Sequence, residues 1–197
     1  MLNNELIPNE FNILNIDDEL FSIFSKYLGI IMTIDSGYCA SNRSVLEIEQ
    51  ARKEDAATIE KIYKQASQEG NITAEDKAAI LNMIKNHHRY YVVVAKTEQQ
   101  VVGFATNEYA WGKLHLLDIA VEEKMRRQGI ARRMIMYLIE YARKKRISEI
   151  YLEVLAKNKV ALRFYKKLDF KERLFTGIIS EGLYGLYYPI TTQECGD

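Results

Sequence analysis

The residues with the clearest chemical potential form one stretch, Val121-Glu-Glu-Lys-Met-Arg-Arg-Gln-Gly-Ile-Ala-Arg-Arg133. It follows an apolar segment and opens the most regular amphipathic pattern of the chain, so it predicts a helix start after a buried strand. Helix N-termini carry unpaired N–H groups and the positive end of the helix dipole, and both attract anions. Gly129 lets a ligand approach the backbone, and Ala131 keeps the next inward position small. The stretch predicts a diphosphate site, with a solvated basic helix end as the alternative.

Positive charge is concentrated in the same part of the chain. From Lys124 to Arg146, nine basic residues accompany a single acidic one, although the formal net charge of the 197 residues is zero. Such a concentration indicates an anionic partner. A nucleic-acid surface ranks last, because no aromatic residues lie among the arginines to stack on bases. The arginines that would flank a diphosphate are Arg126, Arg127, Arg132 and Arg133.

An alternation of strands and helices must position this stretch. We predict strands over 45–51, 90–96, 101–109, 114–121, 150–155, 170–175 and 183–188, and helices over 53–67, 130–143 and 159–168. A further helix carries Ile80 and Ile84, with Thr73 as its cap. The almost wholly apolar segment 114–121 predicts a central strand covered on both faces. This order, with a hairpin in its middle, predicts an α/β (α+β) fold with a mixed, mostly antiparallel sheet flanked by helices.

The length allows one compact domain over 45–190 with a small appendage. Residues 1–44 differ in composition and form an N-terminal extension, with a helix that Asp17 could cap and that runs through Leu28. Its role is open: it could cover a binding groove, mediate homodimerisation or pack on the sheet. Residues 191–197 form a tail.

Cysteine usage and the N-terminus predict a cytoplasmic protein. Cys39 and Cys195 lie far apart without metal-ligand spacing, so we expect reduced thiols and no metal site. The start of the chain lacks the basic residues of a signal peptide. The longest apolar stretch, 20–34, is too short and too polar to span a bilayer, which needs roughly 20 mainly apolar residues. We therefore expect no membrane partner.

Arg126, Gly129 and Ala131 fill a signature in which Arg or Gln is followed, after two residues, by Gly, and after one more by Gly or Ala. This signature resembles that of the GCN5-related N-acetyltransferase (GNAT) family. The preceding Leu116-Leu-Asp-Ile-Ala-Val121 resembles the family's fourth strand, whose backbone pairs with the pantetheine arm of the cofactor.

Two later segments extend the resemblance to about residues 45–190. Leu152-Glu-Val-Leu-Ala-Lys-Asn158 resembles the family's fifth strand, and the segment 161–170 resembles its fourth helix, most closely as in ribosomal-protein alanine N-acetyltransferases. One departure is Asp169, where glycine is usual, although aspartate tolerates the left-handed conformation. The resemblance implies a GNAT-type acyl-CoA N-acyltransferase fold and acetyl transfer from acetyl-CoA (coenzyme A) to a primary amine.

The resemblance also implies which residues hold the cofactor. They lie on the fourth strand, at the start of the following helix and on the fourth helix. The predicted cofactor-binding residues are Ile119, Ala120, Val121, Arg126, Arg127, Gln128, Gly129, Ile130, Ala131, Arg132, Asn158 and Tyr165. We expect Asn158 to cap the helix, and its amide could also hold the pantetheine arm.

Acetyl transfer to an amine needs a neutral amine, a stabilised oxyanion and a protonated leaving thiolate. Tyr165 is the candidate acid, because a phenol stays protonated at neutral pH; a packing role is its alternative. Glu153 is the leading base, acting through water, with a structural ion pair as the alternative. His115 is the rival base, since imidazole titrates near neutrality, and its alternative is a satisfied core histidine. For the oxyanion we expect backbone N–H groups near Ile119 to Val121.

Two functions compete, an active N-acetyltransferase and a non-catalytic acyl-CoA-binding regulatory module. Both bind the cofactor, and they differ in whether Tyr165 and Glu153 support thiol release. The acceptor is an amine-bearing peptide or small molecule. Neither the segment 71–88 nor the tyrosine-rich 183–188 specifies it further.

Overall fold

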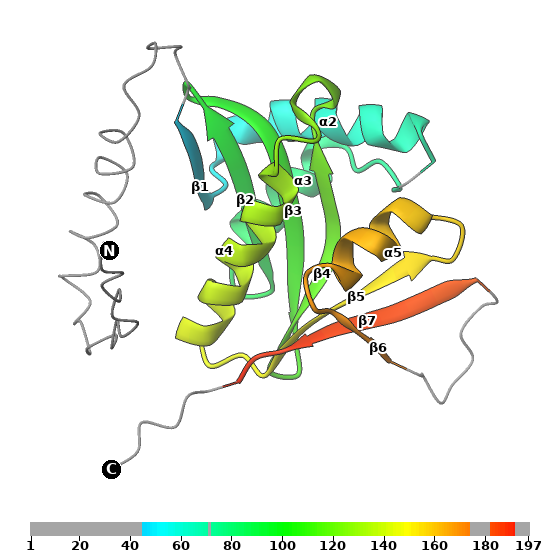
Figure 1. Cartoon of the computed structure of the whole chain (residues 1–197). Helices are drawn as coiled ribbons and strands as arrows, with labels where there is room; N and C mark the ends of the chain where they lie inside the picture. The colour runs from blue at the N-terminus through cyan, green and yellow to red at the C-terminus, as the bar shows by residue number, and fades with distance from the viewer. Residues whose placement is uncertain (1–44, 71, 174–181, 192–197) are drawn as a thin grey trace, which may run out of the picture. The chain divides into compact units, whose positions relative to one another are not determined.

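A computed structural model describes residues 45–70, 72–173 and 182–191 (Figure 1). They belong to one of two compact units of the chain, Ser44–Asp197. The extension predicted over residues 1–44, its helix, and the tail beyond residue 191 lie outside the described residues. In the part of the chain that the structure describes, no helix has the length and apolar character needed to cross a membrane.

Seven strands form one sheet in the order β1-β2-β3-β4-β5-β7-β6. The strands are β1 Leu46–Gln50, β2 Tyr90–Thr97, β3 Gln100–Ala110, β4 Lys113–Val121, β5 Glu149–Leu155, β6 Lys171–Arg173 and β7 Leu183–Pro189. The β4–β5 pair is parallel, and the other neighbours pair antiparallel. This confirms the mixed, mostly antiparallel sheet.

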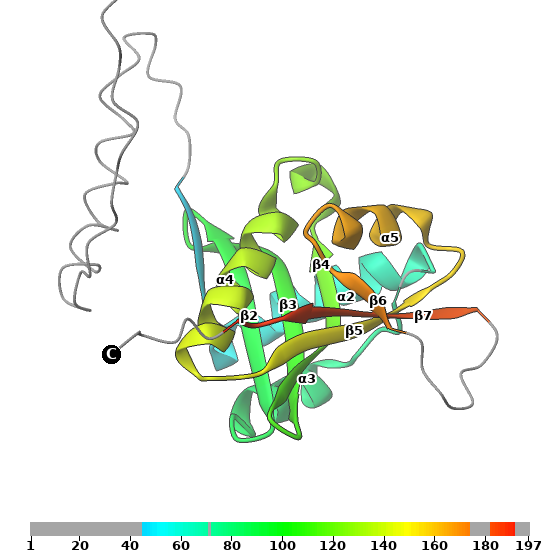
Figure 2. The ribbon, with the colours of Figure 1, turned by 60° about the horizontal axis from the view of Figure 1, so that its bottom comes forward.

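Helices cover both faces of the sheet. They are α2 Ala56–Gln68, α3 Lys77–Lys85, α4 Ile130–Lys144 and α5 Lys159–Lys166, with 3-10 turns η1 Lys53–Asp55 and η2 Glu123–Met125. Figure 2 shows α4 and α5 on one side of β5 and β7, and α3 on the other. The buried side chains follow this division. One cluster joins α4 and α5 to β4, β5 and β7, and a second joins α2 and α3 to β2 and β3.

Two details differ from the sequence prediction. Thr73 does not cap α3; the cap is Asp76, whose carboxylate accepts a hydrogen bond from the Ala79 N–H at 2.7 Å. Asp76 has the extended backbone of an N-cap and stands three residues before that donor, as a cap requires. The strand β4 is also not covered on both faces throughout, because His115 and the segment 117–119 are only partly buried. The neighbouring strand turns away there.

The start of β5 is fixed by a buried ion-pair network around Glu149. Its two carboxylate oxygens accept bidentate hydrogen bonds from Arg173 on β6 at 2.8 and 2.6 Å. Lys113, the first residue of β4, lies 3.0 Å from the same carboxylate. These cations lower the pKa of Glu149, Arg173 contributing most, so the carboxylate stays charged. The network ties the first residues of β4 and β5 together.

Candidate active site

The central feature of the site is an opening between β4 and β5. The two strands pair only at Leu114↔Ile150 and His115↔Tyr151. Beyond these pairs they leave in different directions, as Figure 1 shows. Among the described residues, the facing edges, 116–121 of β4 and 152–155 of β5, therefore have no partner strand across the opening. Backbone N–H and C=O groups on such edges are available to a ligand, and the predicted Ile119–Val121 segment lies on one of them.

A β-bulge lies at the base of this opening. Along the β3–β4 pair, Asn107 is opposite Leu116 and Thr106 is opposite Asp118, so Leu117 is an extra residue in β4. Bulges redirect the side chains that follow them and are frequent beside active sites. Here the bulge directs the Asp118 side chain toward Thr106 and Tyr63 of α2.

The start of α4 has the geometry that an anion site needs. Gly129 is the N-cap residue in the left-handed conformation, with φ 79° and ψ 5°, and no side chain caps the helix. A Cβ added at Gly129 would meet no heavy atom within 4 Å. The N–H groups of the first turn therefore have no side-chain cap among the described residues. The residues of this turn fit a diphosphate, which would accept hydrogen bonds from the amides of residues 128–132.

Arg126 anchors this loop with its side chain. Its Nε donates to the Val121 carbonyl oxygen at 3.0 Å, and its two terminal nitrogens donate to the Glu69 carboxylate at 2.9 and 2.8 Å. The guanidinium therefore joins the end of β4 to the end of α2, and the part of Arg126 left for an anion is its backbone. Arg127 and Arg132 are exposed, with no such contact among the described residues.

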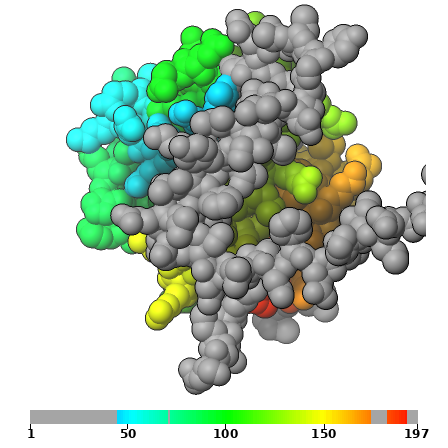
Figure 3. All heavy atoms as spheres, turned by 60° about the vertical axis from the view of Figure 1, so that its left-hand side comes forward, coloured from blue at the N-terminus to red at the C-terminus, as the bar shows by residue number. Residues whose placement is uncertain are grey.

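The nine basic residues do not gather on one face. Five lie before or in the first turn of α4, whereas the run 143–146 lies at its C-terminal end. Figure 3 shows the turn after α4, in yellow, at the surface. A helix of 15 residues is about 22 Å long, so the two groups are well separated. The second group complements the negative end of the helix dipole.

Tyr165 projects from α5 into the core beside the opening. It is 5 % exposed, and its ring packs edge-on against Phe164 and Phe170. Burial raises the pKa of its phenol, and the negative charge of Asp118 raises it further. Tyr165 therefore remains a proton donor throughout the neutral and mildly alkaline range.

The two rival bases form one pair. His115 Nε2 lies 2.6 Å from Glu153 Oε2, and the imidazole stacks on the Tyr151 ring at 4.3 Å between centroids. The pair joins β4 to β5 where their backbone pairing ends, because His115 is in the last register pair and Glu153 lies two residues beyond it. Glu153 is 38 % exposed in its side chain and His115 is 19 % exposed, so solvent reaches both. The predicted alternatives are thus a single unit in which one group orients the other.

We expect substitutions in this pair to be non-additive. Glu153→Gln and His115→Phe should each lower kcat about 100-fold, because positioned bases contribute at least that factor. The kcat of the double variant should be no lower than that of the less active single variant. The measurement is thiol release at saturating acetyl-CoA. Glu172→Gln, which removes an exposed carboxylate paired with Lys166, is the control. If the fold losses in kcat of the two single variants multiply in the double variant, the two residues act separately.

Asn158 caps α5 as predicted. Its Oδ1 accepts a hydrogen bond from the Ala161 N–H at 3.0 Å. This leaves the amide NH₂ group as the part of Asn158 that could bind a ligand. Asp169, after α5, has a φ of 64°, so it adopts the left-handed conformation that the position requires.

Sequence reasoning did not single out Asp118 and Tyr63. The Tyr63 hydroxyl donates to Asp118 Oδ2 at 2.9 Å and lies 3.1 Å from Thr106 Oγ1. Burial, the largest influence, raises the pKa of Asp118. A carboxylate between apolar residues of a strand was the available signal, but the bulge that directs it to α2 leaves no mark in the sequence.

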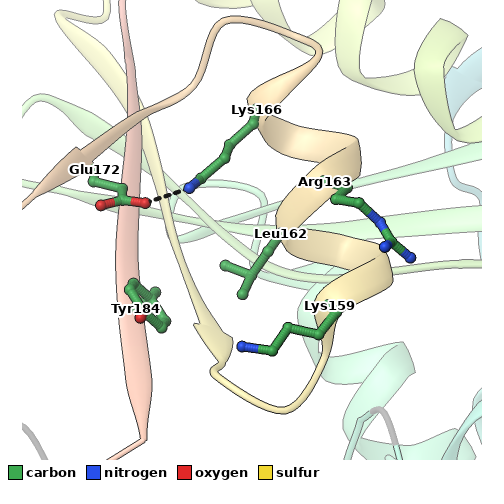
Figure 4. A pocket seen from close by; sticks show the side chains of 6 residues that line it. All are labelled: Lys159, Leu162, Arg163, Lys166, Glu172 and Tyr184. Atoms are coloured by element: carbon green, nitrogen blue, oxygen red, sulfur yellow. Dashed lines mark ion pairs between the residues drawn. The ribbon is translucent and has the colours of Figure 1, made fainter.

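A pocket of about 270 Å³ lies beside α5, toward β6 and β7 (Figure 4). Its lining residues are Lys159, Leu162, Arg163, Lys166, Glu172 and Tyr184. Lys166 forms an ion pair with Glu172 at 2.6 Å across it. None of the predicted site residues lines this pocket, so it is separate from the opening.

A mixed sheet that opens between two parallel strands, beside an uncapped glycine-led helix, defines the acyl-CoA N-acyltransferase fold. A solved structure of yncA from Salmonella typhimurium with acetyl-CoA has this fold, with a TM-score of 0.65, 20% identity, and coverage of 78% of this chain and 99% of that chain. The chain belongs to the acetyltransferase (GNAT) family, whose model matches residues 50–170.

Two curated relatives show how far the sequence similarity extends. A [ribosomal protein bS18]-alanine N-acetyltransferase of Escherichia coli K12 is 32% identical over 73 residues, which are 37% of this chain and 49% of that protein. An N-alpha-acetyltransferase of Sulfurisphaera tokodaii is 34% identical over 92 residues, 40% of this chain and 55% of that protein. The chain thus spans about half the length of the curated relatives it matches.

Proposed function

We propose that this protein transfers an acetyl group from acetyl-CoA to a primary amine. The observation that carries the proposal is a convergence at one opening of the sheet. An uncapped helix start, two unpaired strand edges, a buried phenol and a histidine–carboxylate pair lie on the elements that border it. Family membership and the acetyl-CoA complex of a protein with the same fold support it.

Binding would use the backbone more than side chains. The amides of residues 128–132 would hold the diphosphate, and the free edges of β4 and β5 would pair with the pantetheine arm. Acetyl-CoA supplies the activated thioester. Arg126 would keep the loop in place through Glu69.

The His115–Glu153 pair would take the proton from the amine, directly or through water. A lysine side chain has an unperturbed pKa near 10.4 and an α-amine one near 8, so deprotonation at pH 7 costs roughly 4–5 kcal/mol for lysine and about 1 for the α-amine. A protein N-terminus is therefore the less demanding acceptor. The names of both curated relatives point to N-terminal α-amines.

Amine attack forms a C–N bond at the thioester carbonyl, and collapse then breaks the C–S bond. Backbone N–H groups near Ile119–Val121 would stabilise the oxyanion formed between these events. Tyr165 would act as general acid by sharing its hydroxyl proton with the sulfur as the C–S bond breaks. Because the thiol is a stronger acid than the phenol, it then returns this proton to Tyr165 and takes its own from solvent. Burial keeps the phenol protonated at the start of each turnover.

The test is incubation with acetyl-CoA and a panel of N-terminal peptides, lysine peptides, polyamines and antibiotics, with free thiol as the readout. Calorimetry with acetyl-CoA runs beside it. Acceptor-dependent thiol release supports the proposal. Cofactor binding without release by any acceptor would favour the non-catalytic acyl-CoA-binding module, and no binding at all would overturn both.

A further inference from the structure

Asp118 is a partly buried carboxyl group on β4, beside the opening, that the proposed mechanism does not use. It follows the Leu117 bulge in β4, and the Tyr63 hydroxyl of α2 donates to its Oδ2 at 2.9 Å. Tyr63 itself is fully buried and packs on Phe104 with ring centroids 4.3 Å apart. The carboxyl group is therefore held by a rigid partner.

The charge of Asp118 lacks a cationic partner. Among the described residues, no lysine or arginine forms an ion pair with it, whereas the buried acids Asp55 and Glu149 each form at least one. A carboxylate removed from water is costly unless a cation or hydrogen bonds compensate it. The charge of Asp118 is therefore not neutralised by any described lysine or arginine.

The other groups around Asp118 do not neutralise its charge either. Tyr63 comes from α2, Thr106 from β3 and Tyr165 from α5, and all three are neutral, while Glu75 before α3 adds negative charge. His115 on the same strand is the nearby group that can become cationic, and Glu153 already engages it. Because Asp118 is only partly buried, a cationic ligand in the opening could reach its carboxylate.

We propose that the Asp118 carboxylate, oriented by Tyr63, binds the ammonium group of the acceptor before the His115–Glu153 pair removes its proton. The inference rests on the proposed function and narrows the acceptor to amines that are protonated when they bind. Asp118 would then be a substrate-binding residue on the α2 side of the sheet. Selectivity for cationic amines would follow from one charge-assisted hydrogen bond.

The test compares wild type with Asp118→Asn, which keeps the shape and an acceptor oxygen for Tyr63. We expect the acceptor KM to rise tenfold or more for a cationic peptide amine, with acetyl-CoA KM unchanged. In the CoA-loaded protein, where no transfer can occur, n-butylammonium chloride should raise the Tm of wild type and not of the variant. n-Butanol and potassium chloride are the matched controls.

Thermal stability shows whether Asp118→Asn affects acceptor binding or folding. A carboxyl group with a raised native pKa favours the fold at low pH and loses that contribution as pH rises through the raised pKa. Asp118→Asn should therefore melt no lower than wild type at pH 7, and any advantage should shrink in acid. An unchanged acceptor KM, or equal stabilisation of both proteins by n-butylammonium, would overturn the inference while acetyl transfer by wild type still stood.

Discussion

Replacing Tyr165 by phenylalanine should lower kcat at least 100-fold and leave the Kd for acetyl-CoA within about twofold. The loss follows from removal of the proton donor to the thiolate, since positioned acids contribute 100-fold or more. Binding should persist because the ring keeps its contacts with Phe164 and Phe170. Pre-steady-state thiol release and calorimetry measure the two quantities.

Tyr184→Phe is the matched control for this change. Tyr184 lies on β7, is 40% exposed and lines the separate pocket beside α5. Its hydroxyl should be dispensable for thiol release. If Tyr165→Phe kept wild-type kcat, or if it lost cofactor binding as well, Tyr165 would be a packing residue and not the acid.

Gly129→Ala should weaken acetyl-CoA binding tenfold or more. The new Cβ would occupy the open space beside the helix start, where an anion must approach the backbone closely. The left-handed conformation also costs an alanine about 1–2 kcal/mol, so the free energy of unfolding should fall by that amount. Calorimetry with acetyl-CoA and urea unfolding measure the two effects.

Gly112→Ala separates strain from ligand binding. Gly112, in the β3–β4 turn, has a φ of +73° and equally open surroundings, so its replacement carries a similar conformational cost. It should lose similar stability with an unchanged cofactor Kd. Equal cofactor affinity in both variants would place the diphosphate elsewhere.

The order of elements was predictable because each one bears its own periodicity. The apolar row of α4 and the alternating strands around the β2–β3 hairpin are local patterns, and the sheet follows from them. The cap of α3 was mispredicted because Thr73 and Asp76 both suit an N-cap, and the choice depends on where the backbone becomes helical.

Most residues of the site could be predicted from the sequence, whereas the contacts among them could not. Gly129 is marked by its place between strand and helix, and Tyr165 and Glu153 by family resemblance. That His115 and Glu153 form one pair depends on the parallel register of β4 and β5, which no local pattern specifies. Asp118 depends on the bulge at Leu117, a long-range feature of strand pairing.

The opening between β4 and β5 also makes the sheet mechanically discontinuous. In the part of the chain that the structure describes, β4 joins β5 through two register pairs, the His115–Glu153 pair, the stacking of His115 on Tyr151 and the Glu149 network, and packing under α4 and α5 adds to these contacts. An extended ligand arm lodged there would act as an inserted eighth strand. Amides on both edges would then exchange more slowly with solvent deuterium in the loaded protein than in the free protein.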